Sequence, residues 1–209
     1  MEHTVYIVDD EEPVIAALRN LLGSEGYAVS AFTSPQAFLS QPTVNTPCCL
    51  IVDINMPGMD GFEVSKTLNE RGYSVPTIFL TGFGTIPITV KAMKAGAYEF
   101  LTKPVMPEPL LLAVAEALRI SAQSQVQSQE KRALTERIQS LTPRETEVMQ
   151  LAVSGLLNKQ IAAEMGVSEI TAKVHKRRVM EKMQARSLTD LVRAVEKINR
   201  FKEPRHSHY

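Results

Sequence analysis

The sequence predicts an α/β domain with a doubly wound, five-stranded parallel sheet, followed by an all-α domain of four short helices. Two patterns predict this fold class. Five β-branched or aromatic-rich runs alternate with helical segments through the first 105 residues, and the last third is helical throughout. Charge divides the chain in the same way, since residues 1–120 hold 13 acidic and 7 basic residues and residues 121–209 hold 10 acidic and 16 basic. Opposite charges indicate a cationic partner for the first domain and a polyanionic partner for the second.

The first domain, residues 1–120, is expected to alternate strictly between strands and helices. Such alternation predicts parallel strands covered on both faces, with ligands bound beyond the carboxyl ends of the strands. The expected strands are Thr4–Val8, Ala28–Phe32, Cys49–Val52, Thr77–Leu80 and Tyr98–Leu101. The expected helices are Pro13–Leu22, Gly61–Leu68, Ile86–Ala95 and Pro107–Leu118.

Residues 121–140 form the expected linker, which begins with the polar run SAQSQVQSQE. Gln and Ala tolerate a helix whereas Ser favours helix ends and loops, so a continuous helix and a flexible tether both stay open. Residues 202–209 have no apolar face and are expected to be disordered.

The cysteines and the hydropathy exclude several classes of protein. Cys48 and Cys49 are adjacent, which gives neither a disulfide framework nor zinc-site spacing, so we expect core residues. No apolar stretch approaches the ~18 residues needed to span a bilayer. We therefore expect a cytoplasmic protein without a membrane partner.

The second domain, residues 141–201, has well-marked helix boundaries. Thr142 to Glu145 combine an N-cap, a proline at the first helical position and a capping-box glutamate. Gly166 ends the next short helix, Ser168 caps the third, and Ser187 opens the last. Four short helices with a Gly-Val-Ser turn between the second and third predict a helix-turn-helix architecture.

Five polar residues follow four strands of the first domain. Carboxylates come after the first and third strands, a hydroxyl ends the fourth, and a lysine lies beyond the fifth. In a parallel sheet they converge on one edge, where clustered carboxylates recruit a hard cation such as Mg²⁺. A lysine and a hydroxyl suit the oxygens of a phosphoryl group, so the set predicts phosphoryl transfer to a carboxylate nucleophile, Asp53. The alternative is that each residue is separately a helix cap or a surface charge. The residues are Asp9, Asp10, Asp53, Thr81 and Lys103.

The third helix of the second domain has an apolar stripe and a cationic face. A helix that reads the DNA major groove needs cationic side chains for phosphates and guanines and an apolar side chain for the thymine methyl group. The alternative is that this charged face is only solvated. The inward stripe is Ala172, His175, Val179 and Met183, and the opposite face presents Lys173, Val174 and Arg177, flanked by Lys176 and Arg178.

The first domain resembles the receiver domains of two-component response regulators, in particular the FixJ-type branch, through the motifs VDDEEP, DINMPGMDG, TGFG and LTKP. The resemblance covers about residues 1–120 and implies the flavodoxin-like form of the fold. It implies that Asp53 accepts the phosphoryl group and that Asp10 binds Mg²⁺ directly, with Asp9 acting through water. The backbone carbonyl of Asn55 would complete the metal shell.

The same resemblance implies a switch around the phosphoryl group. Thr81 and Lys103 would contact its oxygens, the Lys103–Pro104 peptide bond would be cis, and Phe100 would turn inward when the Thr81 hydroxyl moves. Phe100 has no hydroxyl to anchor either position, and a permanently buried strand residue is the alternative. Phe83, two residues after Thr81, cannot orient an attacking water, from which we expect a long-lived phosphoryl group.

The second domain resembles LuxR-type DNA-binding domains from Leu141 to Val192. This implies that Lys173, Val174 and Arg177 face bases and that Lys159, Thr171 and Arg178 face phosphates. For His175, a structural hydrogen bond and a DNA contact both stay open. Leu157 replaces the hydroxyl residue that caps the scaffold helix in relatives, and Asn158 is expected to cap it instead.

The last helix carries an apolar stripe that is wider than packing on one small domain needs. Relatives use this helix to form a homodimer on DNA, and plain core packing is the alternative. The stripe comprises Leu188, Leu191, Val192, Val195 and Ile198.

Taken together, these patterns predict a transcription regulator that accepts a phosphoryl group on Asp53 from a sensor histidine kinase and binds double-stranded DNA. RNA polymerase is a further candidate partner. We expect no enzymatic activity other than the chain's own Mg²⁺-dependent phosphorylation at Asp53. A phosphatase with an aspartyl-phosphate intermediate is the first rival, but Asn55 stands where its general acid would lie. A helix-turn-helix used only for protein contacts is the second.

Overall fold

The computed structural model describes residues 3–41, 47–82 and 96–202. The chain divides into two compact units, Met1–Val126 and Gln127–Tyr209, each described here by itself. The expected helix Ile86–Ala95, Phe83 and residues 203–209 of the expected tail lie outside the described residues. Among the helices that the structure describes, none combines the length and the apolar character needed to cross a membrane.

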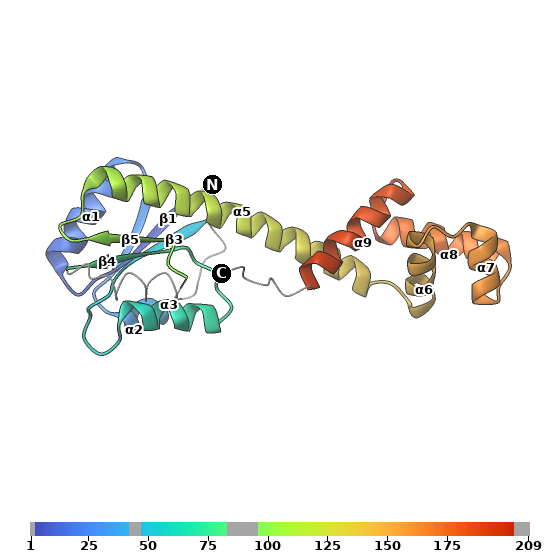
Figure 1. Ribbon diagram of the computed structural model, residues 1–209, viewed down its shortest axis with the longest axis horizontal. Helices are drawn as coiled ribbons and strands as arrows, with labels where there is room; N and C mark the ends of the chain where they lie inside the picture. The colour runs from blue at the N-terminus through green and yellow to red at the C-terminus, as the bar shows by residue number, and fades with distance from the viewer. Residues whose placement is uncertain (1–2, 42–46, 83–95, 203–209) are drawn as a thin grey trace. The chain divides into compact units, whose positions relative to one another are not determined.

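The first unit is built around a five-stranded parallel sheet in the order β2-β1-β3-β4-β5 (Figure 1). The order reverses at β1, so the gap between the carboxyl ends of β1 and β3 is the switch point of the sheet. This confirms the predicted fold class, and each strand end lies within one residue of its predicted position. The strands are β1 (Thr4–Val8), β2 (Ala28–Phe32), β3 (Cys48–Asp53), β4 (Thr77–Thr81) and β5 (Glu99–Thr102).

Two apolar layers sandwich the sheet because alternate residues of each strand point to opposite faces. In β1, Val5 and Ile7 pack against α1 and α5, whereas Tyr6 and Val8 pack against α2 and α3. Cys48 and Cys49 are free, buried strand residues, as predicted. The helices of this unit are α1 (Glu12–Ser24), α2 (Pro35–Leu39), α3 (Gly61–Glu70) and α5 (Pro107–Gln139, which continues into the second unit).

Helix α5 includes most of the segment for which the sequence left helix or tether open. Ser121, the first residue of the polar run, is buried in the first unit, and its Oγ accepts a hydrogen bond from the backbone N–H of Cys48 at 3.0 Å. The first compact unit runs to Val126 and so includes the first residues of the polar run.

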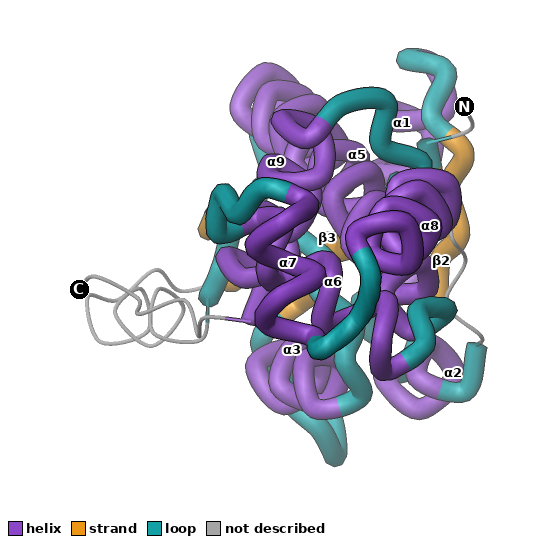
Figure 2. The backbone as a smooth tube through the Cα atoms, turned by 90° about the vertical axis from the view of Figure 1, so that its right-hand side faces the viewer, coloured by secondary structure: helices purple, strands orange, loops and turns teal. Residues whose placement is uncertain are grey.

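In the described part of the second unit, four helices pack around one core, and Figure 2 traces the loops that join them. Two of the predicted caps are present: Thr142 and Glu145 form a capping box, and the Ser168 hydroxyl accepts from the backbone N–H of Thr171. Gly166 ends its helix at a φ of 65°, in the left-handed region that favours glycine. The helices are α6 (Pro143–Val153), α7 (Asn158–Met165), α8 (Glu169–Lys182) and α9 (Leu188–Lys202).

Candidate functional site

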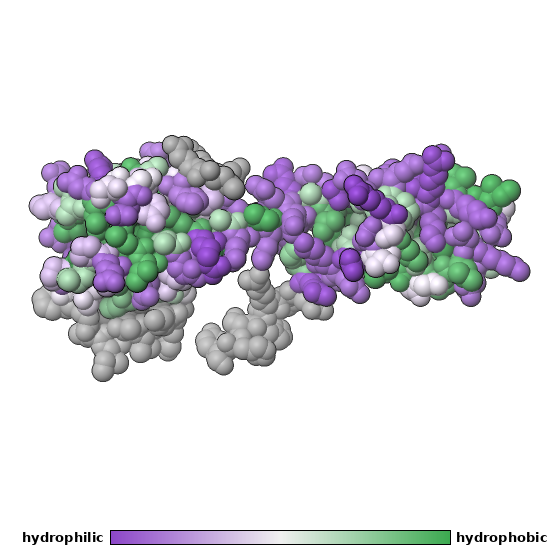
Figure 3. Space-filling view, turned by 90° about the horizontal axis from the view of Figure 1, so that it is seen from above, coloured by the Kyte–Doolittle hydropathy of each residue, from purple (hydrophilic) through white to green (hydrophobic). Residues whose placement is uncertain are grey.

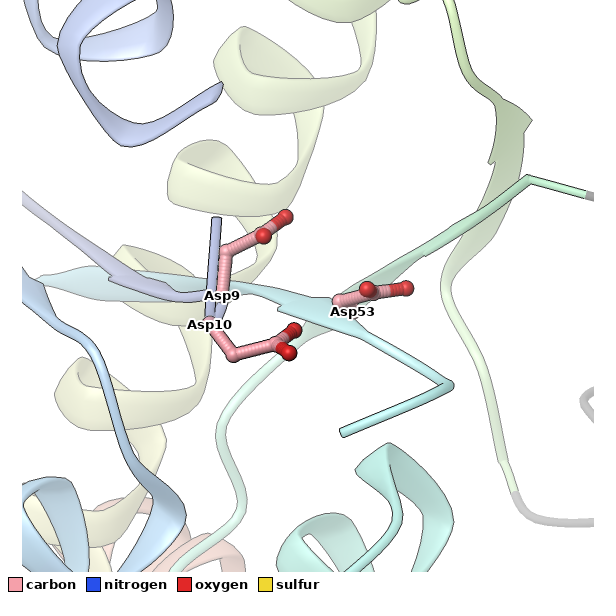
Figure 4. Close-up of side chains that lie close together, drawn as sticks. All are labelled: Asp9, Asp10 and Asp53. Atoms are coloured by element: carbon pink, nitrogen blue, oxygen red, sulfur yellow. The ribbon is translucent and has the colours of Figure 1, made fainter. Parts of the chain in front are cut away.

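Three carboxylates meet at the switch point of the sheet. Asp9 and Asp10 follow β1, and Asp53 is the last residue of β3. One oxygen from each carboxylate lies within 4.8 Å of the others, and Figure 4 shows the Asp10 carboxylate directed toward the end of β3. Asp9 and Asp53 are buried whereas Asp10 is exposed, so the cluster is open to solvent at Asp10. Such a set of oxygen ligands can hold a hard divalent cation.

Lys103 brings a positive charge to these carboxylates. Its Nζ lies 2.8 Å from Asp9 Oδ2, 3.0 Å from Asp53 Oδ2 and 2.9 Å from Glu11 Oε1. Burial alone would lower the pKa of Lys103, but the hydrogen bonds to the three carboxylates raise it above its usual value. The lysine therefore stays an ammonium, ready to bind an anionic group at Asp53.

Asp9 is the most deeply buried carboxylate of the cluster. Burial raises the pKa of its carboxyl, and the hydrogen bonds from Lys103 and from the Glu11 backbone N–H act in the opposite direction. The Glu11 N–H donates to Oδ1 at 2.9 Å. Oδ2 lies 2.8 Å from the Lys103 ammonium, and no other described residue donates a hydrogen bond to it. This oxygen can accept a further donor, such as a metal-bound water.

Helix α3 approaches the backbone at the end of β3 closely, and the sequence did not predict this contact. Asp53 Oδ1 accepts from the Asn55 N–H at 3.3 Å, and the Gly61 N–H donates to the Ile54 carbonyl at 3.1 Å. A Cβ on Gly61 would lie 2.5 Å from the backbone oxygen of Asp53. Helix α3 can approach the end of β3 because residue 61 is glycine. The Asp-Gly pair in the sequence suggested only a helix start.

The remaining receiver residues lie at the neighbouring strand ends. Thr81 is fully buried at the end of β4 and is in register with Thr102 of β5. Phe100 is a half-buried residue of β5 that packs against the core on the α3 side of the sheet. The Lys103–Pro104 peptide bond is cis, as predicted. Among the described residues, Glu11 is a side chain at this site that the sequence left unassigned, although it directly follows the two aspartates of VDDEEP.

Helix α8 in the second unit has the two faces that the sequence predicted. Ala172, Val179 and Met183 are buried in the core of this unit. His175 is half-buried, and its Nδ1 is buried without a hydrogen-bond partner in the described part of the chain, so the structural hydrogen bond is not formed at this atom.

The opposite face of α8 is cationic. Lys173 pairs with Glu169 at 3.3 Å, and Arg177 with Glu181 at 2.8 Å, so the two predicted base-facing cations are each held by an acid of the same helix. Exposed ion pairs of this kind are weak and can be exchanged for a stronger anion. Of the other predicted contact residues, Lys159, Val174 and Arg178 are exposed. Thr171 and Lys176 are half-buried.

The start of α7 corrects one prediction. Leu157 is the N-cap residue and has no side chain that could accept a hydrogen bond. Asn158 does not cap the helix: it is the first helical residue, and its Oδ1 has no hydrogen-bond partner among the described residues. The Gln160 side chain accepts from the Leu157 N–H at 2.8 Å instead. A side chain already inside the first turn points back along the helix and cannot reach the N–H groups ahead of it.

A half-buried ion pair joins α6 to the end of α8: the Glu145 side chain is buried, whereas 36% of the Lys182 side chain is exposed. Lys182 Nζ lies 2.6 Å from Glu145 Oε2 and donates to the Ser140 carbonyl at 2.9 Å. The Lys182 ammonium and the Thr142 backbone N–H lower the pKa of Glu145 to about 2. The sequence predicted only the cap, because the partner is 37 positions away along the chain.

The apolar stripe of α9 divides between core and surface. Leu191 and Ile198 are buried in the core, whereas Val192 and Val195 are half-buried and Leu188 is 38% exposed. Core packing thus accounts for part of the stripe and leaves one edge uncovered by the described residues of this unit.

Comparison with known proteins places both units in described families. A model described as "Response regulator receiver domain" matches residues 5–115, and one described as "Bacterial regulatory proteins, luxR family" matches residues 139–195. The chain is 42% identical over 194 residues to the response regulator protein TodT of Pseudomonas putida, covering 93% of this chain and 86% of TodT. It is 40% identical over 189 residues to the transcriptional regulatory protein FixJ of Azorhizobium caulinodans, covering 90% of each. The solved structure of the response regulator StyR has a TM-score of 0.88 at 43% identity and covers 94% of this chain and 100% of that one.

Proposed function

We propose that Asp53 is the phospho-acceptor of this chain, which belongs to the response regulators that join a receiver domain to a LuxR-type DNA-binding domain. The observation that carries the proposal is the position of Asp53 at the switch point, 3.0 Å from the Lys103 ammonium and within 4.8 Å of two further carboxylates. The family regulates transcription and does not consist of classical enzymes, which removes the support for the phosphatase alternative.

In the proposed reaction a sensor histidine kinase presents a phosphohistidine. A carboxylate oxygen of Asp53 attacks the phosphorus, a P–O bond forms, and the P–N bond to the histidine breaks. The Lys103 ammonium then forms an ion pair with a phosphoryl oxygen, which replaces some of its ion pairs with the carboxylates. The Thr81 hydroxyl binds another oxygen, and Phe100 moves into the space that Thr81 leaves.

The donor set fits Mg²⁺, because it offers carboxylate oxygens on one open side and a buried Asp9 oxygen with unused acceptor capacity. Asp10, Asp53 and the Asn55 carbonyl would hold the ion directly, and Asp9 would hold it through water. When bound, the ion supplies charge neutralisation for the phosphoryl oxygens. A bound ion would also offset the repulsion among the three carboxylates.

Phosphorylation in turn controls DNA binding by α8. Lys173, Val174 and Arg177 face base edges, and Lys159, Thr171, Lys176 and Arg178 lie near phosphates. The exposed edge of α9 pairs two copies on a two-fold related site, and RNA polymerase is a further partner.

Incubation of the full chain with acetyl phosphate and MgCl₂ tests the receiver, and intact-mass analysis measures the phosphoryl adduct. Asp53→Asn should give no adduct, whereas the control Asp190→Asn, in the second unit, should be phosphorylated like the parent. Selection of bound sequences from a random DNA pool, with and without the phosphodonor, tests the coupling. An adduct on Asp53→Asn, or identical selected sequences and affinities in both arms, would contradict the proposal.

A further inference from the structure

An apolar strip on the exposed face of α8 is not explained by the folding of its domain. Ile170 is 76% exposed and Val174 is 45% exposed, and they lie four residues apart on the same face of the helix. The helix packs its opposite face into the core. Figure 3 shows apolar surface at the end of the second unit where α7 and α8 lie. These two side chains lie next to each other and bury little of their apolar surface within the domain, and adjoining exposed apolar groups often mark a binding surface.

The surroundings of the strip indicate what covers it. Lys173 and Arg177 lie beside it on the same exposed face, and Arg178 is exposed on the flank. An apolar strip with a cationic rim fits a polyanion that carries apolar groups. The DNA major groove is such a surface, because phosphates line it and each thymine presents its C5-methyl group there.

The position of Ile170 in the helix supports the same partner. It is the second residue of α8, in the first turn. The Thr171 backbone N–H donates to the Ser168 hydroxyl to cap this turn, and the two hydroxyls also bond to each other, so Ile170 takes no part in the cap. In helix-turn-helix proteins the N-terminal residues of the recognition helix contact base edges. Residue 170 is therefore placed to meet a base, while its side chain has no structural task in the cap.

We propose that Ile170 is a specificity-determining residue that, together with Val174, reads the C5-methyl groups of thymines. This inference rests on the proposed DNA binding by α8. Side chains four residues apart on a helix are separated by about 5–6 Å, and stacked bases by about 3.4 Å. The two residues therefore read thymines one or two base steps apart, next to the guanines that Arg177 recognises.

Deoxyuridine provides the test, because it keeps every hydrogen-bonding group of thymine and lacks only the methyl. A site is first selected from random double-stranded DNA by the phosphorylated full chain, and each thymine is then replaced singly. The parent should lose roughly fourfold in affinity at one or two positions, the effect of removing one buried methyl group. Ile170→Ala should bind the parent site about as weakly as the parent binds the uridine site, and it should be insensitive to uridine at one of those positions. Ile170→Val should keep part of the sensitivity.

Leu157→Ala is the matched control, since Leu157 is 72% exposed but lies at the start of α7. It should keep the full response to uridine. If the parent selects no sequence at all, the proposed function and this inference both fail. If the parent selects a site but uridine has no effect, or affects Ile170→Ala as much as the parent, only this inference fails.

Discussion

Replacing Gly61 by alanine should damage both the stability of the receiver and the reactivity of Asp53. The new Cβ would lie 2.5 Å from the Asp53 backbone oxygen, 3.1 Å from its carbonyl carbon and 3.2 Å from Ile54 Cα. Ordinary contacts begin at 3.4 Å, so α3 and the end of β3 must separate by about 0.9 Å. Neither α3 nor β3 can move easily, because the atoms in the way belong to the backbone and β3 is buried along its whole length.

The size of the effect follows from two opposing terms. Alanine is favoured over glycine within a helix by about 0.5–1 kcal/mol, whereas overpacking against a rigid neighbour costs about 1–3 kcal/mol. We expect a net loss of about 1–2 kcal/mol in the free energy of unfolding. Phosphorylation by acetyl phosphate should slow about 10- to 100-fold, since displacing a reacting group by about 1 Å has effects of that order.

Gly23→Ala is the matched control. Gly23 also lies in a helix, does not have a positive φ, and would place its Cβ with no atom within 4 Å. This variant should gain about 0.5–1 kcal/mol and be phosphorylated at the parental rate. Urea unfolding followed by circular dichroism and the initial rate of adduct formation measure the two quantities. Equal stability and equal rates for the two alanine variants would refute the reasoning from close approach.

Three further predictions concern the charged groups. Glu11→Gln should speed phosphorylation by no more than about fivefold, because an exposed carboxylate competes weakly with the phosphoryl group for Lys103; a slower initial rate would contradict this. Glu145 has a pKa lowered to about 2, so its ionised form stabilises the second domain above the usual carboxyl pKa, and this contribution is lost as pH falls through about 4.5 toward 2. Glu145→Gln should remove about 2 kcal/mol at neutral pH and flatten that acid limb in urea unfolding. In DNA titrations Arg177→Ala should relax sequence preference, whereas Arg178→Ala should weaken binding to all sequences and reduce the salt slope by about 1.

The sequence predicted the features that depend on periodicity and on strand ends. Strict alternation implies parallel strands, and the carboxyl ends of parallel strands must share an edge, so Asp9, Asp53 and Lys103 could be brought together without a structure. The inward stripe of α8 followed from helical spacing in the same way, since Ala172 and Val179 are core residues.

The sequence did not predict features that depend on very short elements or on contacts between residues far apart in the chain. Helix α2 has only five residues, too few for a periodic pattern. The Glu145–Lys182 ion pair joins two helices that no local pattern connects. Asn158 was wrongly taken as a cap, because a polar residue near a helix start does not by itself identify the capping position.

The hydrogen bond from Cys48 to Ser121 determines where this chain can be cut and rejoined. Composition places the end of the first domain at residue 120, and a chimera that fused residues 1–120 to another output domain would discard the Ser121 hydroxyl. The N–H at the start of β3 would then be buried without an acceptor, at a penalty of about 1–3 kcal/mol. A fusion point after Val126 keeps this acceptor. Receivers exchanged between regulators should therefore carry the first turns of the polar run with them.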